Sequence, residues 1–387
     1  MLRQIYDIAL RECAILRSHP IYLFCMVVFP IFITLLFTSL MGEGQPTNMP
    51  IGVVDQDNTS TSRAIIRQLD AFQNSHVAAR YATMTEARKG IQQNEIYAFI
   101  LIPKGTTSGL KASRQPKISI YYSSVTLLAG STLFKDLKTV CTLASANAGA
   151  AKLSALGKTE RETQTFLQPI VVDLHMIGNP QADYNVYLST IMVPGLLLLF
   201  IFLITPYAIG TEIKFGRSKE WLAMAGGDIK KALVGKLLPH TLVFLSIFYA
   251  YELYVYHALG FPHPGGVVPI LLIGLLAVLA SQGFGIFIFG IMPSLRMAMC
   301  VCSLWAVLSF SVCGATYPVF AMDSMIEAMA QLFPLRHYYM VYQTSIFGGY
   351  PLSDCHLNIA ALILFAALPI LVLRPLKRAM LQYVYLP

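Results

Sequence analysis

Long stretches without a charged residue constrain this chain more than any other feature. No Asp, Glu, Lys or Arg occurs between Asp183 and Glu212, or between Glu252 and Arg296. A helical run of about 18 or more apolar residues is long enough to cross the roughly 30 Å hydrocarbon core of a bilayer. Only 12% of the 387 residues are charged, about half the share of roughly 25% in a soluble domain. The sequence therefore predicts a polytopic α-helical membrane protein.

Six segments have the length and composition of transmembrane helices. They are Ile21–Met41, Val186–Ile209, Leu233–Tyr256, Val267–Met292, Met297–Phe320 and Leu357–Leu373. The first is longer than a signal-peptide core and has no A-x-A-like cleavage site, so we expect a retained anchor. Before it, residues 1–20 place apolar side chains at helical spacing, which is typical of an amphipathic helix on the membrane surface. A plain cytoplasmic extension of the first span is the alternative.

The distribution of basic residues predicts the orientation. Fourteen of the 28 Lys and Arg lie between the first two spans, in a segment large enough to cross the membrane regardless of charge. Of the other fourteen, a cytoplasmic N-terminus places thirteen in the cytoplasm and only Arg336 outside. We therefore expect a multi-pass protein of the bacterial inner (plasma) membrane with a cytoplasmic N-terminus and a cytoplasmic tail, residues 379–387. This asymmetry also accounts for the net charge of +8 without a nucleic-acid partner.

Residues 42–183 have an ordinary soluble composition and, at about 140 residues, suffice for one domain. Strands are expected around Ile51–Val54, at Tyr97–Gly105, at Lys117–Tyr122 and at Ile170–Gly178, with a long Ala-rich helix over Thr132–Leu156. Alternating strands and helices predict an α/β domain. The orientation above places this large domain outside the cytoplasm, between spans one and two.

Sequence motifs for catalysis are absent. The chain contains no G-x-S-x-G, no H-E-x-x-H and no zinc-spaced Cys and His. Asp55 and Asp57 could form a metal site or an acid–base couple, but we favour a turn, where Asp accepts backbone hydrogen bonds. No phosphate-binding G-x-x-x-x-G-K-[ST] loop occurs: Gly157–Lys158–Thr159 has Lys152 where the first Gly is needed, and Leu237 follows Gly235–Lys236. The chain is therefore expected to bind no cofactor and not to hydrolyse ATP.

Three polar residues lie in or beside the third span. Lys236 and Glu252 are close to its ends, where a long side chain reaches the membrane interface. His240 is interpreted as a packed or hydrogen-bonded residue in preference to a proton relay. The spans therefore lack the paired buried carboxylates expected of a proton-driven carrier.

The segment between the second and third spans, residues 212–236, carries both signs of charge. Ser218–Ala225 is predicted to form a short helix with Trp221 and Leu222 on one side. An aromatic–aliphatic knob with a charged rim suits docking into a groove of a soluble partner. The alternative is a solvated loop whose Trp221 lies among the lipid headgroups.

The segment 317–349 is apolar but irregular. Two prolines, Pro318 and Pro334, interrupt it, and it carries Arg336. Non-helical backbone at membrane depth must be buried in protein or line a wet cavity. We favour a re-entrant helical pair over a surface-lying amphipathic helix.

The layout and three motifs together resemble the type-two exporter permeases of the ATP-binding cassette (ABC) superfamily, over essentially the whole chain. The motifs are "IGVVDQDNTSTSRAII" with "AFILIPKG", "GTEIKFGRSKEWLAMAGGDIKKALVGKLL", and "YPVFAMDSMIEAMAQLFPLRHYYMVYQTSIFGG". In the second, Glu212, Gly216, Trp221–Leu222 and Gly235–Lys236 stand at positions typical of the family. The usual acidic–Arg–acidic triplet is replaced by Glu212–Ile213–Lys214, which leaves the contacts with the ATPase open.

This resemblance implies a permease that moves a solute out of the cytoplasm or inner membrane, powered by a separate ATPase subunit that binds ATP and Mg. It implies ATPase-coupling residues Glu212, Gly216, Trp221 and Leu222, and a re-entrant segment with Pro318, Pro334, Arg336, His337 and Tyr338. It also implies a second permease, identical or paralogous, and hand-over to a periplasmic adaptor protein. A multi-span receptor or assembly scaffold is the competing interpretation. Drug-like amphiphiles, lipids, glycans and peptides all remain open as substrates.

Overall fold

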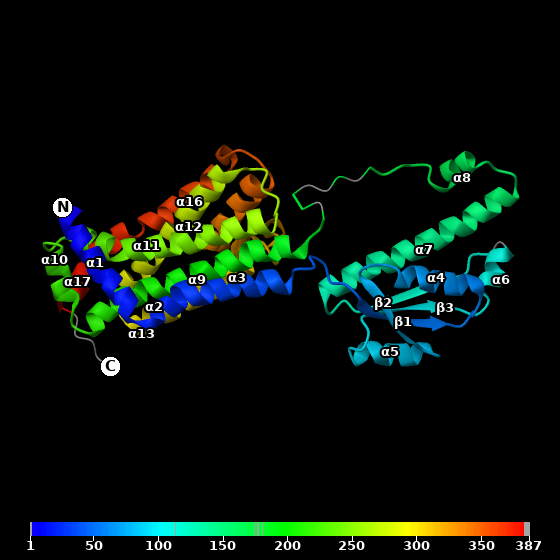
Figure 1. Ribbon diagram of the computed structural model, residues 1–387, viewed down its shortest axis with the longest axis horizontal. Coiled ribbons are helices and arrows are strands. Elements are labelled where there is room, and N and C mark those ends of the chain that lie inside the picture. The colour runs from blue at the N-terminus through cyan, green and yellow to red at the C-terminus, as the bar shows by residue number, and fades with distance from the viewer. Residues whose placement is uncertain (1, 113, 174, 176–177, 180, 383–387) are drawn as a thin grey trace. The chain divides into compact units, whose positions relative to one another are not determined.

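The computed structural model describes residues 2–112, 114–173, 175, 178–179 and 181–382 (Figure 1). It divides into two compact units. The helical unit comprises residues 1–42 and 176–387, and the α/β unit comprises residues 43–175.

Six helical segments within the described residues are long and apolar enough to cross a membrane. Three of them are single helices: α9 (Tyr184–Lys214), α12 (Val267–Ile291) and α13 (Leu295–Val312). The first span, Pro20–Leu40, consists of α2 (Pro20–Leu23), a π-helical turn (Phe24–Val28) and α3 (Phe29–Leu40), and the third, Ile229–Ala258, consists of α11 (Ile229–Leu253) and the π-helical segment η2 (Tyr254–Ala258). The last, Leu352–Gln382, consists of a 3₁₀ turn (Leu352–Cys355), α16 (His356–Ala367) and α17 (Pro369–Gln382). The prediction of a polytopic helical membrane protein is confirmed.

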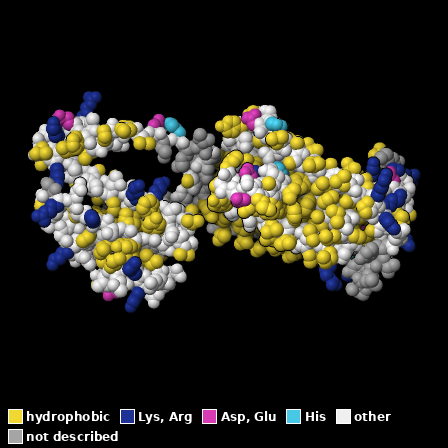
Figure 2. Space-filling view, turned by 180° about the vertical axis from the view of Figure 1, so that it is seen from behind, with side chains coloured by type: hydrophobic (Ala, Val, Ile, Leu, Met, Phe, Trp, Pro, Cys, Tyr) yellow, Lys and Arg dark blue, Asp and Glu magenta, His cyan; other side chains and the backbone are white. Residues whose placement is uncertain are grey.

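The helical unit has a centre and a periphery. In α9 and α12 the most apolar window is 67% buried, whereas in the last span it is 17% buried. The outer helices therefore turn apolar side chains outward, and hydrophobic residues cover most of this unit on the face shown in Figure 2. In a soluble protein so large an exposed apolar surface would be a liability. In a bilayer it is the surface that faces lipid.

The ends of the fifth and sixth spans differ most from the sequence-based boundaries. The fifth span was expected to reach Phe320, but α13 ends at Val312, and Gly314 follows with a φ of 105°, a conformation that favours Gly. The last span continues past Arg374 to Gln382, so the predicted tail 379–387 is helical as far as it is described. Between these spans lie a 3₁₀ turn (Val319–Ala321), α14 (Ser324–Ala330), α15 (Pro334–Val341) and the π-helical segment η4 (Tyr342–Phe347).

The α/β unit contains a four-stranded sheet in the order β2-β1-β3-β4. Its strands are β1 (Met49–Asp55), β2 (Ser75–Arg80), β3 (Ala98–Ile102) and β4 (Ser119–Tyr122). β1 pairs in parallel with β2 and β3, and β4 is antiparallel to β3. The continuous apolar runs of β1 and β3 fit this arrangement, because parallel strands are buried on both faces.

Helices cover the two faces of this sheet (Figure 1). α4 (Ser60–Asp70) and the long α7 (Leu127–Ala155) bury their apolar residues with one face of the sheet, and α5 (Met84–Gln92) packs on the other. The short α6 (Thr106–Lys111) follows β3, and α8 (Glu160–Leu167) follows α7.

The strand predictions are confirmed at β1, β3 and β4 but not elsewhere. A strand was expected over Ile170–Gly178, yet residues 170–173 and 175 are not in a strand, and the remainder includes positions outside the described residues. Ile170, Val171 and Val172 are exposed; no neighbouring strand pairs with this run, and pairing is what makes an apolar run a strand. Conversely, β2 has little β-propensity of its own and forms because β1 offers it an edge.

Asp55 and Asp57 form a hydrogen-bonded turn at the end of β1, as the sequence suggested. The Asp55 carboxylate accepts hydrogen bonds from the N–H groups of Asp57 and Asn58, both at 3.0 Å. Asp57 accepts from the Gly105 N–H at 2.8 Å and from the Thr107 hydroxyl at 2.6 Å. These bonds, led by that of the Thr107 hydroxyl, hold the pKa of Asp57 below its usual value.

We expect the Asp57→Asn variant to lower the stability of the α/β unit by roughly 1 kcal/mol at neutral pH, as for a partly exposed charged hydrogen bond. Because the pKa of folded Asp57 is depressed, its contribution is present above the ordinary Asp pKa and is lost as pH falls through the lowered value. Hydrogen exchange of β1 and α6 in the full chain, measured from neutral to acidic pH, checks this. Asp173→Asn, at a carboxylate 84% exposed, is the control. An equal loss for Asp57→Asn at every pH would contradict the prediction.

Candidate functional site

The segment that joins α9 to α11 is shaped by glycine-terminated helix ends. At the end of α9 the Gly216 N–H donates to the Ile213 carbonyl and the Arg217 N–H to the Glu212 carbonyl. This is the Schellman pattern, and Gly216 supplies its left-handed residue with a φ of 70°. The short α10 (Ser218–Met224) follows and ends in the same pattern, at Gly226 with a φ of 65°.

Asp228 begins α11 by accepting a hydrogen bond from the Lys230 N–H at 2.9 Å. The predicted helix between the second and third spans is therefore present, in a compact helix–turn–helix. It occupies the end of the helical unit where α1 (Leu2–Ser18) and α17 also lie (Figure 1).

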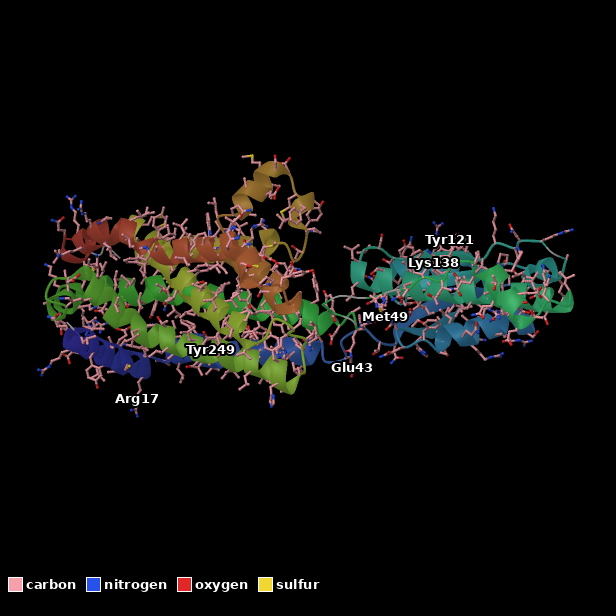
Figure 3. All side chains as sticks on the ribbon, turned by 90° about the horizontal axis from the view of Figure 1, so that it is seen from above. Arg17, Glu43, Met49, Tyr121, Lys138 and Tyr249 are labelled. Atoms are coloured by element: carbon pink, nitrogen blue, oxygen red, sulfur yellow. The ribbon has the colours of Figure 1, made fainter. Side chains whose placement is uncertain are left out.

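α1 packs closely along α11. A Cβ atom added to Gly235 would lie 2.8 Å from the Ile8 side chain and 3.0 Å from the Ile5 carbonyl oxygen, so this approach requires glycine. Ile8 and Glu12 are buried on this face of α1. Arg17 is exposed and points away from the helices (Figure 3).

A buried network of charges lies beneath this contact. The Lys236 ammonium donates to Glu12 at 2.6 Å and to Glu212 at 2.9 Å. Arg11 donates to both oxygens of Glu212, at 3.0 and 2.9 Å. His240 Nε2 lies 2.9 Å from the other oxygen of Glu12. α1 thus meets α9 and α11, which are distant from it in sequence, in one set of ionic hydrogen bonds.

Each buried charge of the network has a partner of opposite sign. Lys236, Glu12, Glu212 and His240 are each exposed by about 1% or less. Both carboxylates face cations: Glu12 faces Lys236, whereas Glu212 faces Lys236, Arg11 and, at 3.9 Å, Arg217. Buried ion pairs are tolerated when geometry and partners are complete. Burial alone would raise the pKa of Glu12, but the hydrogen bond with His240 and the charge of Lys236 outweigh burial and lower that pKa. Likewise, Glu212 raises the pKa of Arg11 against the opposing effect of burial.

Trp221 of α10 covers the network. Its ring centroid lies 5.2 Å from the Lys236 ammonium, within the range of a cation–π contact. Its Nε1 donates to the Ala232 carbonyl at 3.2 Å. On the other side, the Ser218 hydroxyl donates to the Met380 carbonyl and the Lys377 ammonium to the Gly227 carbonyl, so α17 holds the same segment. The position of α10 is therefore tied to four other helices.

Comparison with known proteins places this architecture in a family. The family model described as "ABC-2 family transporter protein" matches residues 20–373. The chain belongs to the ABC-2 transporter family. It is 19% identical over 360 residues to the linearmycin resistance permease protein LnrN of Bacillus subtilis (strain 168), an alignment that covers 87% of this chain and 89% of the relative.

The protein is therefore an ABC transporter permease and a multi-pass membrane protein. In this family ATP hydrolysis belongs to a separate subunit. Among the described residues no group of three or more His, Cys, Asp or Glu is placed to hold a metal ion.

The prediction that Trp221 and Leu222 form an exposed knob is wrong. Trp221 is 0% and Leu222 4% exposed, because both fill the space between α10 and the helices below it. Neither can be the surface that a partner first touches, so changes at these residues would also affect folding. Gly216 is exposed at its turn. The role of these residues and of Glu212 in ATPase coupling stays a prediction.

The prediction that Lys236 and Glu252 reach the membrane interface is wrong. They are 1% and 2% exposed, because side chains of other helices surround them. His240 is packed and hydrogen-bonded, as expected. Glu12 was not predicted from the sequence as a site residue. The one local feature that indicates its burial is its helical spacing with Ile5 and Ile8. Phe215, an aromatic residue that is 62% exposed beside α10, was not predicted either.

The residues predicted in segment 317–349 lie in a different part of the helical unit. Pro334 opens α15, and Arg336, His337 and Tyr338 are all buried on it. His337 binds the Asn358 side chain and the Gln331 carbonyl, each at 2.9 Å. Pro318 stands apart from α15, before the 3₁₀ turn. Whether this segment re-enters the membrane stays a prediction.

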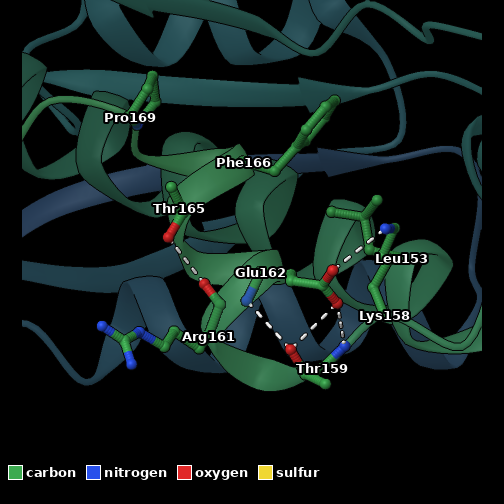
Figure 4. Close-up of a pocket in the computed structure, with 8 residues that line it drawn as sticks. All are labelled: Leu153, Lys158, Thr159, Arg161, Glu162, Thr165, Phe166 and Pro169. Carbon is green, nitrogen blue, oxygen red and sulfur yellow. Dashed lines mark hydrogen bonds and ion pairs between the residues drawn. The ribbon is translucent and has the colours of Figure 1, made fainter.

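An open pocket of about 610 Å³ lies between α7 and α8 in the α/β unit (Figure 4). Its polar groups serve the helix end: the Glu162 carboxylate accepts from the Thr159 N–H and from the Lys158 ammonium. This is a capping box at the start of α8. The polar side chains that line the pocket therefore stabilise the start of α8 and do not indicate a ligand.

The network makes a prediction about stability. Glu212→Gln and Lys236→Met each leave a buried charge without its partner, so each should destabilise the helical unit by about 3–5 kcal/mol. The double variant Glu12→Gln with Lys236→Met retains the Arg11–Glu212 pair and should recover part of the loss of Lys236→Met. Thermal unfolding in detergent measures this, with Glu160→Gln, an exposed carboxylate, as control. Additive losses in the double variant would show that Glu12 and Lys236 do not act as a pair.

Proposed function

We propose that this permease exports a solute from the cytoplasm or inner membrane, driven by ATP hydrolysis on a separate ATPase subunit that carries ATP and Mg. The buried network under α10 carries this proposal. A force applied to α10 reaches the start of α11 through Trp221 and Lys236 and the end of α9 through Glu212. A partner can shift such an equilibrium only through contacts that differ between its two states.

The surface of this segment offers a contact for the ATPase. Phe215, Lys219 and Glu220 are exposed while the residues beneath them are buried. Arg217 lies over the Phe215 ring, 5.4 Å from its centroid, so the aromatic side chain has a charged rim. An exposed aromatic residue with charged neighbours is typical of a protein-binding hot spot. We therefore propose that Phe215, and not Trp221, contacts the ATPase, and that Trp221 transmits the movement to the helices beneath.

The direction of transport and the assembly are part of the proposal. Export is supported by the family and by the relative whose name contains linearmycin resistance. We propose a complex of two ATPase subunits with two permeases, as a homodimer or with a paralogue, in the bacterial inner membrane with both termini cytoplasmic. Co-purification of differently tagged copies tests the dimer. A periplasmic adaptor stays a prediction of the family resemblance, and a receptor or scaffold is the outcome if no ATPase associates.

The coupling surface gives a sharp test. Phe215→Ala should leave thermal stability unchanged, since the ring is exposed, but should weaken binding of the ATPase by roughly thirtyfold if it removes about 2 kcal/mol of contact. Affinity for the purified ATPase and stimulation of ATP hydrolysis are the measurements.

Phe320→Ala is the matched control, because this ring is 90% exposed but lies in segment 317–349. Full affinity and stimulation in Phe215→Ala would remove Phe215 from the contact. Loss of both in Phe320→Ala as well would point to a general effect.

The orientation gives another test. Cys13 is exposed, whereas Cys141 is partly buried and burial raises the pKa of its thiol, so Cys141 reacts slowly. A Thr139→Cys variant places a thiol on the exposed side of α7. In sealed cells a membrane-impermeant maleimide should label residue 139 and not Cys13. Labelling of Cys13 with residue 139 protected would reverse the proposed topology.

A further inference from the structure

Glu252, near the end of α11, is also a buried carboxylate, and it is held quite differently from Glu12 of α1 and Glu212 of α9. Both of its oxygens are buried, and neither has a partner in regular hydrogen-bonding geometry among the described residues. No Lys, Arg or His in the described part of the chain forms an ion pair with it, whereas Glu12 and Glu212 each pair with Lys236. It is 2% exposed.

Tyrosines from three elements surround this carboxyl group. The hydroxyls of Tyr256 from η2 and Tyr338 from α15 face it, and Tyr342 of η4 lies next to both, with its hydroxyl against that of Tyr256. Tyr251 precedes Glu252 and donates to the Ser189 carbonyl of α9 at 2.9 Å. His263 also packs here, with its ring 4.7 Å from that of Tyr256. The surroundings thus supply hydroxyl groups and rings.

The cost of an unpaired charge decides the state of Glu252. An ionised carboxylate without a counter-ion in an apolar interior is so costly that the group neutralises instead. Both oxygens are enclosed by protein atoms, so neither a metal ion nor an ammonium group has space beside them. A proton is the one cation that fits. We propose that Glu252 is a proton-binding site in the membrane-spanning part of the permease.

This proton site joins two parts of the helical unit. Glu252 and Tyr256 belong to α11–η2, whereas Tyr338 and Tyr342 belong to α15–η4. Both sides carry a π-helical segment at the contact, Tyr254–Ala258 and Tyr342–Phe347, a local irregularity that is frequent at functional sites. When α15–η4 separates from α11, water reaches the carboxyl group and the proton leaves for solvent. The contact re-forms when a proton returns, so its closure is linked to pH.

The site is distinct from the coupling surface. Glu252 follows Lys236 by 16 residues in one helix, which at about 1.5 Å per residue separates them by roughly 24 Å. ATP hydrolysis remains the energy source in the proposed function, and the proton sets how readily this contact opens. The proton site can therefore be tested whether or not the protein exports anything.

Infrared spectroscopy of the full chain in lipid nanodiscs tests the proton directly. The wild type should show the C=O stretch of a protonated carboxylic acid at neutral pH, and Glu252→Gln should lack it. Glu160→Gln, at an exposed carboxylate, should retain it. A spectrum in which Glu252→Gln removes no such band would overturn the proposal.

Stability supplies an independent readout. Gln is a neutral isostere of the protonated acid, so Glu252→Gln should shift Tm by no more than about 2 °C, the lower end of the effect of 1 kcal/mol in a protein of this size. Glu252→Ala leaves a gap and should cost more. Loss of folding in Glu252→Gln comparable with that in Glu252→Ala would show that the native group is ionised and paired, against the proposal.

Hydrogen exchange of residues 334–347 tests the link to α15–η4. After correction for intrinsic rates, opening in the wild type should rise with pH, by up to about tenfold per pH unit because one proton is released. In Glu252→Gln it should not depend on pH. The same pH dependence in both proteins would overturn the link.

Discussion

The helical unit depends on the ion pairs that the Lys236 ammonium forms with Glu12 and Glu212. Removing an ammonium group from water costs several kcal/mol unless its partners are in place. Those partners come from α1 and from the end of α9, so Lys236 is satisfied only when both helices have docked on α11. Trp221 then closes over the ion, which fixes α10. The same requirement therefore positions the segment that we assign to ATPase coupling.

The two ends of α11 resolve the problem of a buried charge in opposite ways. Near its start, oppositely charged side chains are collected from other helices and neutralise one another. Near its end, Glu252 faces tyrosines, and we assign a proton as its counter-charge. An ionic network gives a rigid connection, suited to transmitting movement, whereas a protonated acid gives a contact that water can open. α11 thus joins a rigid ionic network near its start to a contact near its end that protonation of Glu252 controls.

The predictable parts were those governed by neighbours in sequence. Long hydrophobic runs predicted six spans, and short apolar runs predicted β1, β3 and β4. The helix now called α10 followed from the local pattern of Ser218–Ala225. The strand expected at Ile170–Gly178 is absent where the chain is described, because a strand also needs an edge to pair with. Span ends were misplaced at α13, where Gly314 breaks the helix before the apolar run is complete.

The sequence by itself determined the membrane class, the number of spans and the family, because hydrophobicity and local motifs act over a few helical turns. Only the tertiary structure decided the candidate site. Glu12 and Lys236 are 224 residues apart, and read alone each is an ordinary charged residue near an interface. Trp221 was predicted to be exposed because the sequence does not show which helices pack against it. Burial is a property of what packs around a side chain, and charges change meaning when burial removes water from them.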